Sequence, residues 1–261
     1  MYKAFLQPFE TYLPAEEVAV IVIEPIQGDG GIIKVPQAYM EKIYAFAKQN
    51  GILFAIDEVN QGMGRTGKWW SIQHFPGIEP DLMSVGKSLA SGMPLSAVVG
   101  RKEIMEALGP AANVYTTAGN PVTAAAANAT LDVIEEEHLV ERSAKLGQKA
   151  KDFFDQEQAK YDFVGDVRLY GLNGGISIVD PATGKGDVEA TTKLMYRIFE
   201  LGAIIISLRG NILRFQPPLV ITEEQLDKAF AIIDQAFTEL AAGKLSLPFN
   251  AEELGLSLIH I

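Results

Sequence analysis

The chain has 261 residues, 48% hydrophobic and 21% charged, a composition typical of a globular protein with a sizeable core. Its formal net charge of -11 argues against nucleic acid as the main partner, because phosphate binding needs a basic surface. The absence of cysteine excludes disulfides and thiolate metal sites, and three widely separated histidines argue against a zinc motif. No apolar run is long enough to span a bilayer and residues 1–20 do not form a signal peptide, so we expect a cytoplasmic protein without a membrane partner.

The first half of the chain alternates strand and helix signals. Residues 18–24 form a continuous, β-branched apolar run, which predicts a strand buried on both faces. A helix is expected over residues 36–49, with Pro36 at its start and Gly51 beyond its end. Further strands are predicted at residues 52–56, 82–85 and 96–99. This alternation indicates an α/β fold with a mostly parallel sheet.

Three side chains follow predicted strands directly. In sheets of this kind, ligand-binding residues collect just beyond the carboxyl ends of the strands. Glu24, Asp57 (with the adjacent Glu58) and Lys87 occupy such positions and are therefore candidate site residues.

The second half begins with a helix-rich stretch over residues 121–158 and then has an α+β pattern. Its predicted strands and helices cover residues 167–172, 175–179, 187–201, 203–207 and 212–215, with a last helix after Thr222, where Gln225 completes a capping box. Residues 180–186 are expected to form a hairpin or surface loop. We predict one domain over residues 1–137 and a smaller one over residues 138–255, and the apolar residues 256–261 are a possible non-native tail.

Five ordered segments carry a family resemblance: IEPIQGDGG, AIDEVNQGMGRTG, PDLMSVGKSLASGMPLSAVVG, TTAGNP and LRFQPPL. They resemble the class III aminotransferases, the family of 4-aminobutyrate and ornithine transaminases. The resemblance implies the type I fold of pyridoxal-phosphate-dependent transferases. The chain would supply the C-terminal part of the large domain, followed by the α+β C-terminal domain.

The resemblance also assigns roles to individual residues. Lys87 would form the Schiff base with the cofactor, pyridoxal 5'-phosphate, and a desolvated site would lower the pKa of its amine. Asp57 would pair with the pyridinium nitrogen. Thr116 would reach the cofactor phosphate of the neighbouring subunit in a homodimer, and Arg214 would bind the substrate carboxylate.

Two positions depart from the usual family pattern. Asn60, expected near the ring oxygen of the cofactor, replaces the usual Gln, and its shorter amide would have to reach the same atom. Asp29 replaces the usual Glu of the GEGG motif.

Nearly the whole chain resembles one subgroup, the lactobacillal isoleucine 2-epimerases, in phrases such as GILFAIDEVNQG and GNILRFQPPLVI. That resemblance implies inversion of the α-carbon of nonpolar, branched-chain amino acids. Inversion needs acid/base groups on both faces of the carbanion, and Lys87 and Asp29 are the candidates. Asp29 could instead only stabilise its turn. The alternative activity is transamination between an amino donor and a keto acid.

Family members carry a longer N-terminal portion, including a loop at a helix N-terminus that cradles the cofactor phosphate. We therefore expect a C-terminal fragment that does not hold the cofactor tightly alone, and a catalytically incomplete chain is a further alternative. A nucleotide-binding loop around Gly86–Lys87–Ser88 is disfavoured, because that motif needs glycine where Asp81 stands.

Overall fold

The computed structural model describes residues 1–107, 109 and 115–247, and the predicted tail at residues 256–261 lies outside them. The chain divides into two compact units. The first contains Met1–Gln27 and Lys34–Val140, and the second contains Gly28–Ile33 and the chain from Glu141 onward. The predicted domains are continuous in sequence, residues 1–137 and 138–255. In the structure, the Gly28–Ile33 segment belongs to the second unit although it lies early in the chain. Among the described residues, no helix combines the length and apolar character needed to cross a membrane.

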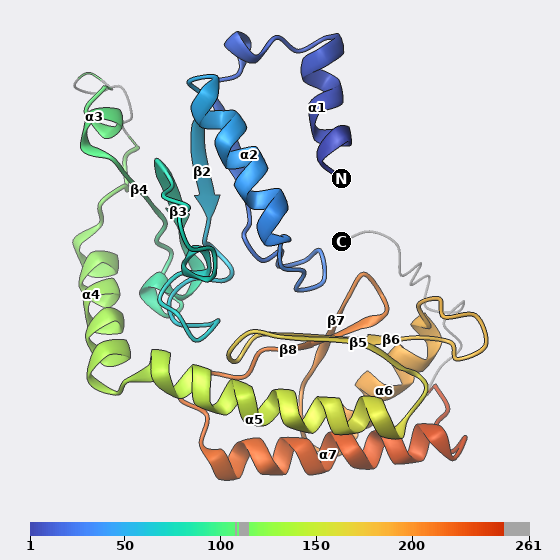
Figure 1. Ribbon diagram of the computed structural model, residues 1–261. Helices are drawn as coiled ribbons and strands as arrows, with labels where there is room; N and C mark the ends of the chain where they lie inside the picture. The colour runs from blue at the N-terminus through green and yellow to red at the C-terminus, as the bar shows by residue number, and fades with distance from the viewer. Residues whose placement is uncertain (108, 110–114, 248–261) are drawn as a thin grey trace. The chain divides into compact units, whose positions relative to one another are not determined.

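The first unit is built on a four-stranded sheet in the order β1-β2-β3-β4 (Figure 1). Its strands are β1 (Val20–Ile23), β2 (Leu53–Asp57), β3 (Leu82–Val85) and β4 (Ala97–Gly100). The first three strands are parallel, and β4 pairs antiparallel with β3. The predicted α/β fold with a mostly parallel sheet is therefore confirmed.

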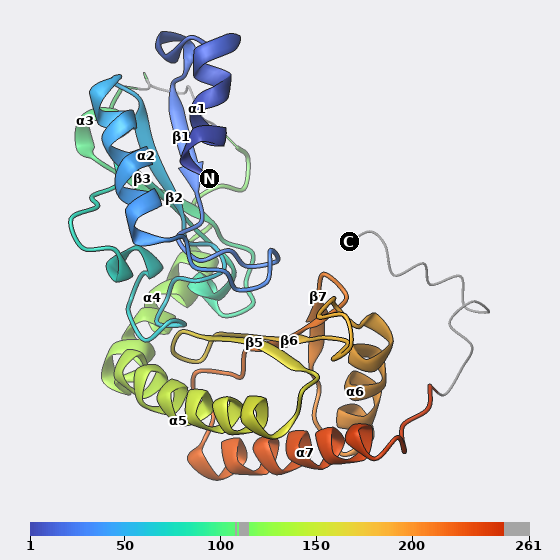
Figure 2. The same ribbon diagram turned by 45° about the vertical axis from the view of Figure 1, so that its right-hand side comes forward.

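Helices cover one face of this sheet. The helical elements of the unit are α1 (Tyr2–Thr11), η1 (Ala15–Glu17), α2 (Gln37–Gln49), η2 (Ser71–His74), η3 (Lys87–Ala90), α3 (Lys102–Met105) and α4 (Pro121–Glu136). Met40 and Ile43 of α2 are buried in one cluster with Phe54 and Ile56 of β2. In the two views of Figure 1 and Figure 2, α2 lies along β2 and α1 lies beyond it. Because strand side chains alternate between faces, Asp57 lies on the face opposite α2.

The opposite face is less covered, which corrects the prediction that residues 18–24 are buried on both faces. Val22 is 63% exposed and Val20 is 37% exposed, whereas Ile21 and Ile23 pack against the α2 cluster. The physical reason is that the side chains of Val20 and Val22 alternate to the face away from the α2 cluster, and β1 also lies at the edge of the sheet, where it pairs only with β2 in the described chain. The continuous apolar run therefore predicted the position of the strand correctly, but the prediction that both of its faces are buried was wrong.

A buried carboxylate stabilises the entry to β3. Asp81 is 3% exposed and accepts hydrogen bonds from Lys48 Nζ at 2.7 Å, the Phe54 amide at 2.8 Å and Arg101 Nη1 at 2.9 Å. Burial raises the pKa of Asp81, but the hydrogen bonds from these three donors more than offset it, so the pKa lies below its ordinary value. The Asp81 carboxylate therefore connects α2, β2 and the residue that follows β4.

Replacing Asp81 with Asn should destabilise the chain by about 2 kcal/mol at pH 7, less than for a fully buried ion pair because Lys48 and Arg101 are partly solvated. A lowered folded-state pKa gives stability that is present above the unfolded-state value, near 4, and lost as the pH falls through the folded-state value. Urea unfolding between pH 7 and pH 3 should show the variant difference shrinking as the pH falls. The exposed Asp132→Asn on α4 is the control, and an equal difference at both ends would contradict this role.

The second unit packs three helices on a four-stranded antiparallel sheet in the order β5-β6-β8-β7. The elements are α5 (Leu139–Lys160), β5 (Val164–Leu169), β6 (Gly174–Ile178), α6 (Val188–Glu200), β7 (Ile206–Leu208), β8 (Ile212–Phe215) and α7 (Glu223–Ala241). In both views α5 and α7 run side by side, and the rings of Phe153 and Phe230 stack between them at 4.3 Å (Figure 1, Figure 2). Ile176, Leu213 and Phe215 of the sheet belong to the same core. The predicted α+β pattern is confirmed.

The helix-rich stretch expected over residues 121–158 consists of two helices, α4 and α5, with His138 between them at a φ of 50°. The left-handed backbone at His138 ends the first helix and redirects the chain. The strand expected at residues 167–172 lies three residues earlier, as β5, and the strand expected at residues 203–207 begins three residues later and ends one residue later, as β7.

Candidate functional site

The carboxyl ends of β2 and β3 bring two of the predicted site residues to one edge of the sheet. Asp57 is the last residue of β2 and pairs with Ser84 of β3. Lys87 follows only three residues after Ser84, at the start of η3. Because β2 and β3 are parallel neighbours, the carboxylate and the amine leave the sheet at the same end.

The Asp57 carboxylate is held by its own turn. Its Oδ1 accepts a hydrogen bond from the Val59 amide at 2.9 Å, and the Glu58 amide donates to the Ser84 carbonyl at 3.0 Å. These bonds connect the end of β2 to β3 and fix the side chain in the half-buried position that it occupies. Asn60 follows in the same turn and is also half-buried.

Lys87 has an unusual backbone and an accessible side chain. Its φ is 45°, in the left-handed region that non-glycine residues rarely adopt. Helix α4 packs against η3, the element that Lys87 opens. Lys87 is exposed in this chain, so the predicted desolvated surroundings of its amine are not present within the described residues. The reason is that Lys87 sits at the open end of the strands, where the described chain places no covering element.

A buried glutamate supports the turn after Asp57. Glu58 is 1% exposed and accepts hydrogen bonds from the Ser71 amide at 2.9 Å and the Ile72 amide at 2.8 Å. Burial raises the pKa of the Glu58 carboxyl, against the opposing effect of the bonds from these amides. Within the enclosed turn, a Cβ at Gly62 would approach the Trp70 ring to 2.8 Å, so only glycine fits there. The carboxylate thereby ties the glycine-rich turn to η2.

Thr116 lies in an exposed turn that precedes α4. The helix itself is well started, because the Asn120 side chain accepts a hydrogen bond from the Val122 amide at 2.9 Å and Pro121 occupies the first turn. The structure describes no contact from Thr116 to Asp57 or Lys87, so its role at a neighbouring subunit stays a prediction.

In the second unit, Arg214 lies on the face of the sheet opposite the helices. It is half-buried in β8 and pairs with Gly175 of β6, whereas its neighbours Leu213 and Phe215 face the core. Arg168 of β5 pairs with Gly175 from the other side. Paired residues of an antiparallel sheet share a face, so two arginines flank one glycine on the open face.

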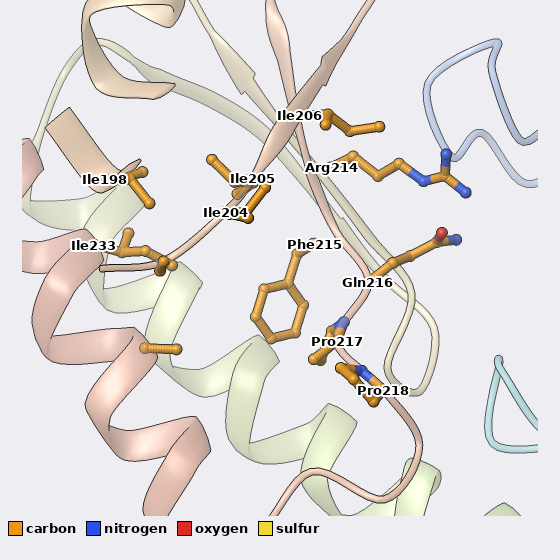
Figure 3. A pocket seen from close by; sticks show the side chains of 12 residues that line it. Ile198, Ile204, Ile205, Ile206, Arg214, Phe215, Gln216, Pro217, Pro218 and Ile233 are labelled. Atoms are coloured by element: carbon orange, nitrogen blue, oxygen red, sulfur yellow. The ribbon is translucent and has the colours of Figure 1, made fainter. Parts of the chain in front are cut away.

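Arg214 also borders a pocket of about 350 Å³ at the edge of this sheet. Figure 3 shows Arg214 and Gln216 pointing away from Ile198 and Ile233, which line the opposite wall. The walls are mostly apolar, with Phe215 at the centre of the view. Arg214 therefore points its guanidinium away from the apolar wall.

Asp29 is exposed in the Gly28–Ile33 segment, which packs against this same face. The Gly31 carbonyl accepts a hydrogen bond from Arg168 Nε at 2.9 Å. A Cβ at Gly175 would come within 2.8 Å of that carbonyl oxygen, so the loop lies directly over the glycine between the two arginines. The structure thus brings the loop of Asp29 to the strand of Arg214.

Sequence reasoning placed Glu58 among the candidate ligand-binding residues but did not foresee that it is a buried acceptor, and it missed Arg168 as a donor to the Asp29 loop. Glu58 had one available signal, because it directly follows a buried strand where a charge is costly without partners. Arg168 gave none, since its partner Gly31 is 137 residues away in the sequence.

The arrangement offers an amine and a carboxylate after neighbouring strands of the first unit, and in the second unit a second carboxylate on the loop that accepts a hydrogen bond from Arg168. Among the residues that the structure describes, no group of three or more His, Asp or Glu side chains could hold a metal ion. Lys87 and Asp57 together suit a cofactor with an aldehyde and a basic ring nitrogen. The amine of Lys87 can form a bond to the aldehyde carbon, and the carboxylate of Asp57 can accept a hydrogen bond from the protonated ring nitrogen.

Comparison with known proteins gives consistent matches. Residues 3–237 match the family model described as aminotransferase class-III. The isoleucine 2-epimerase of Lentilactobacillus buchneri is 58% identical over 97% of this chain and 57% of its own length, and the leucine/methionine racemase of Thermococcus litoralis is 42% identical over 91% and 54%. A crystal structure of Toxoplasma gondii ornithine aminotransferase, reported with partial occupancy of PLP at its active site, superposes with a TM-score of 0.81 at 28% identity over 94% of this chain and 56% of its own. The chain thus spans about half the length of these relatives.

Proposed function

Because the chain belongs to the aminotransferase class-III family, we propose that it forms part of a pyridoxal-phosphate-dependent enzyme that inverts the α-carbon of nonpolar, branched-chain amino acids. The observation that carries the proposal is the placement of Lys87 and Asp57 after neighbouring parallel strands. The similarity to an isoleucine epimerase and to a racemase of leucine and methionine supports inversion as the reaction.

The first unit would hold the cofactor. Lys87 would bond its aldehyde, Asp57 would accept a hydrogen bond from its ring nitrogen, and Asn60 would contact its ring oxygen. When bound, the cofactor withdraws electrons from the substrate α-carbon, which makes the α-hydrogen acidic. The Asp57 carboxylate is already oriented by the Val59 amide, so it needs no rearrangement to serve as an acceptor.

The α-proton would be handled by two groups. Lys87 Nζ would remove or deliver it on one face of the carbon, and the Asp29 carboxylate would do so on the other. Arg214 would bind the substrate carboxylate through paired N–H···O bonds. We further propose a homodimer in the cytoplasm, in which Thr116 contacts the cofactor phosphate of the partner subunit.

Transamination is the alternative, and it is favoured by the similarity to ornithine aminotransferase. The two reactions need the same lysine but differ in their products. In the full-length protein with added pyridoxal phosphate, L-isoleucine supplied without any keto acid should be converted to its 2-epimer, with no keto acid formed. Chiral chromatography and a keto-acid assay measure both products. A strict requirement for an amino acceptor would reject epimerisation and favour transamination.

A further inference from the structure

The Gly28–Ile33 loop is held on the second unit by a small set of close contacts. Arg168 is 13% exposed at its side chain, and its Nε donates to the Gly31 carbonyl at 2.9 Å. Two neighbouring side chains hold the guanidinium of Arg168 in place. Its Nη1 and Nη2 donate to Ser177 Oγ at 3.1 and 3.2 Å, and its Nη1 pairs with the Asp166 carboxylate at 2.5 Å. The donor that meets the loop therefore has little freedom to move.

Two glycines let the loop come this close to the sheet. A Cβ at Gly31 would meet Ile212 Cδ1 at 2.6 Å, and a Cβ at Gly175 would meet the Gly31 carbonyl oxygen at 2.8 Å. The loop also adopts an unfavourable backbone, with φ of 113° at Gly31 and 57° at Ile32. A β-branched residue rarely adopts a positive φ, so surrounding contacts must hold Ile32 in that conformation.

Asp29 is two residues from the Gly31 carbonyl, within the same short loop. Asp29 is exposed, so the position of its carboxylate depends on the backbone that carries it. Arg168, Gly175 and Arg214 form a row across β5, β6 and β8. The contact from Arg168 to Gly31 thus sets where the loop stands relative to the strand of Arg214.

We propose that Arg168 is a positioning residue that seats the Asp29 loop on the sheet, so that the Asp29 carboxylate can exchange a proton with one face of the substrate α-carbon. The inference rests on the proposed function. Arg168 does not touch substrate in this account; it acts through the Gly31 carbonyl. In the reaction one base takes the α-proton and the opposite acid returns a proton, so a misplaced loop affects only one of these two transfers.

The test uses Arg168→Lys in the full-length protein with cofactor, in D2O. Lysine keeps a positive charge on the open face but lacks the planar fork that binds Ser177 and Gly31 together. Two rates are measured with each of the two epimers: loss of the α-hydrogen to solvent, which for the epimer that presents this hydrogen to Lys87 needs the Lys87 side alone, and inversion, which needs both sides. We expect inversion to fall by roughly tenfold or more, because small misplacements of a reacting group are costly, while exchange changes by less than about threefold.

Arg168→Ala and Gly175→Ala should lower the ratio of inversion to exchange in the same way. The first removes the hydrogen bond to the Gly31 carbonyl, and the second adds a Cβ that would lie 2.8 Å from that carbonyl oxygen. The exposed Arg209→Ala, in the turn between β7 and β8, is the matched control and should leave the ratio unchanged. A wild-type ratio in Arg168→Lys would overturn the proposal. If the unmodified enzyme exchanges the hydrogen but never inverts, the proposed epimerase function fails instead, and the two failures are distinguishable.

Discussion

Replacing Lys87 with Ala in the full-length protein should lower both inversion of L-isoleucine and exchange of its α-hydrogen by at least about 10³-fold. The amine is proposed both to bond the cofactor and to carry the proton on one face, so one substitution removes a covalent contact and a general base together. Chiral chromatography and proton NMR in D2O measure the two losses.

The structure separates this loss from a loss of fold. Lys87 is exposed, and removing an exposed side chain normally changes stability by less than about 0.5 kcal/mol. Thermal unfolding of the cofactor-free variant should therefore match that of the cofactor-free wild type. Lys185→Ala, in the exposed turn over residues 180–186, is the matched control and should keep full activity. A Lys87→Ala enzyme that retains activity within about tenfold of wild type would refute the assignment.

Asp57→Asn is the second large effect, and we expect a fall in inversion of roughly 10²-fold or more. The amide can keep the bond from the Val59 amide through its remaining oxygen, so the turn should stay in place. It cannot supply the negative charge that keeps the cofactor ring nitrogen protonated, so the α-hydrogen becomes less acidic. Retention of the cofactor should weaken as well.

The measurements are steady-state inversion rates and the cofactor absorbance that remains after gel filtration. The exposed Asp152→Asn on α5 removes the same charge elsewhere and should change neither. If Asp57→Asn kept wild-type rates, the carboxylate would be structural, and its bond to the Val59 amide would be its whole role.

The strands of the first unit could be predicted because each is a short apolar run, and Asp57 and Lys87 because they directly follow such runs. The edge position of β1 could not be predicted, because it depends on which strands pair across the sheet and not on the apolar run that forms the strand. The break at His138 also gave no signal, because the charged residues on both sides favour helix and carry no proline or glycine.

The contacts that organise the Asp29 loop are long-range, which explains why local patterns did not reveal them. Arg168 and Gly31 are separated by 137 residues, and the assignment of Gly28–Ile33 to the second unit follows from that packing. The different bounds of β5 and β7 have a local reason. Glycines beside β5 and the continuous apolar run before β7 interrupt the alternation of apolar and polar residues, so this alternation does not show where either strand begins or ends. Resemblance to a family indicated the candidate functional residues, and the structure showed which residues contact their loops and turns.

The central claim is that the amine of residue 87 captures a cofactor aldehyde beside the carboxylate of Asp57. Borohydride reduction of the cofactor-loaded full-length protein, followed by peptide mapping, tests it most directly. The account predicts a single cofactor label on the peptide that contains Lys87. A label on another lysine, such as Lys68 or Lys102, with Lys87 unmodified, would contradict it.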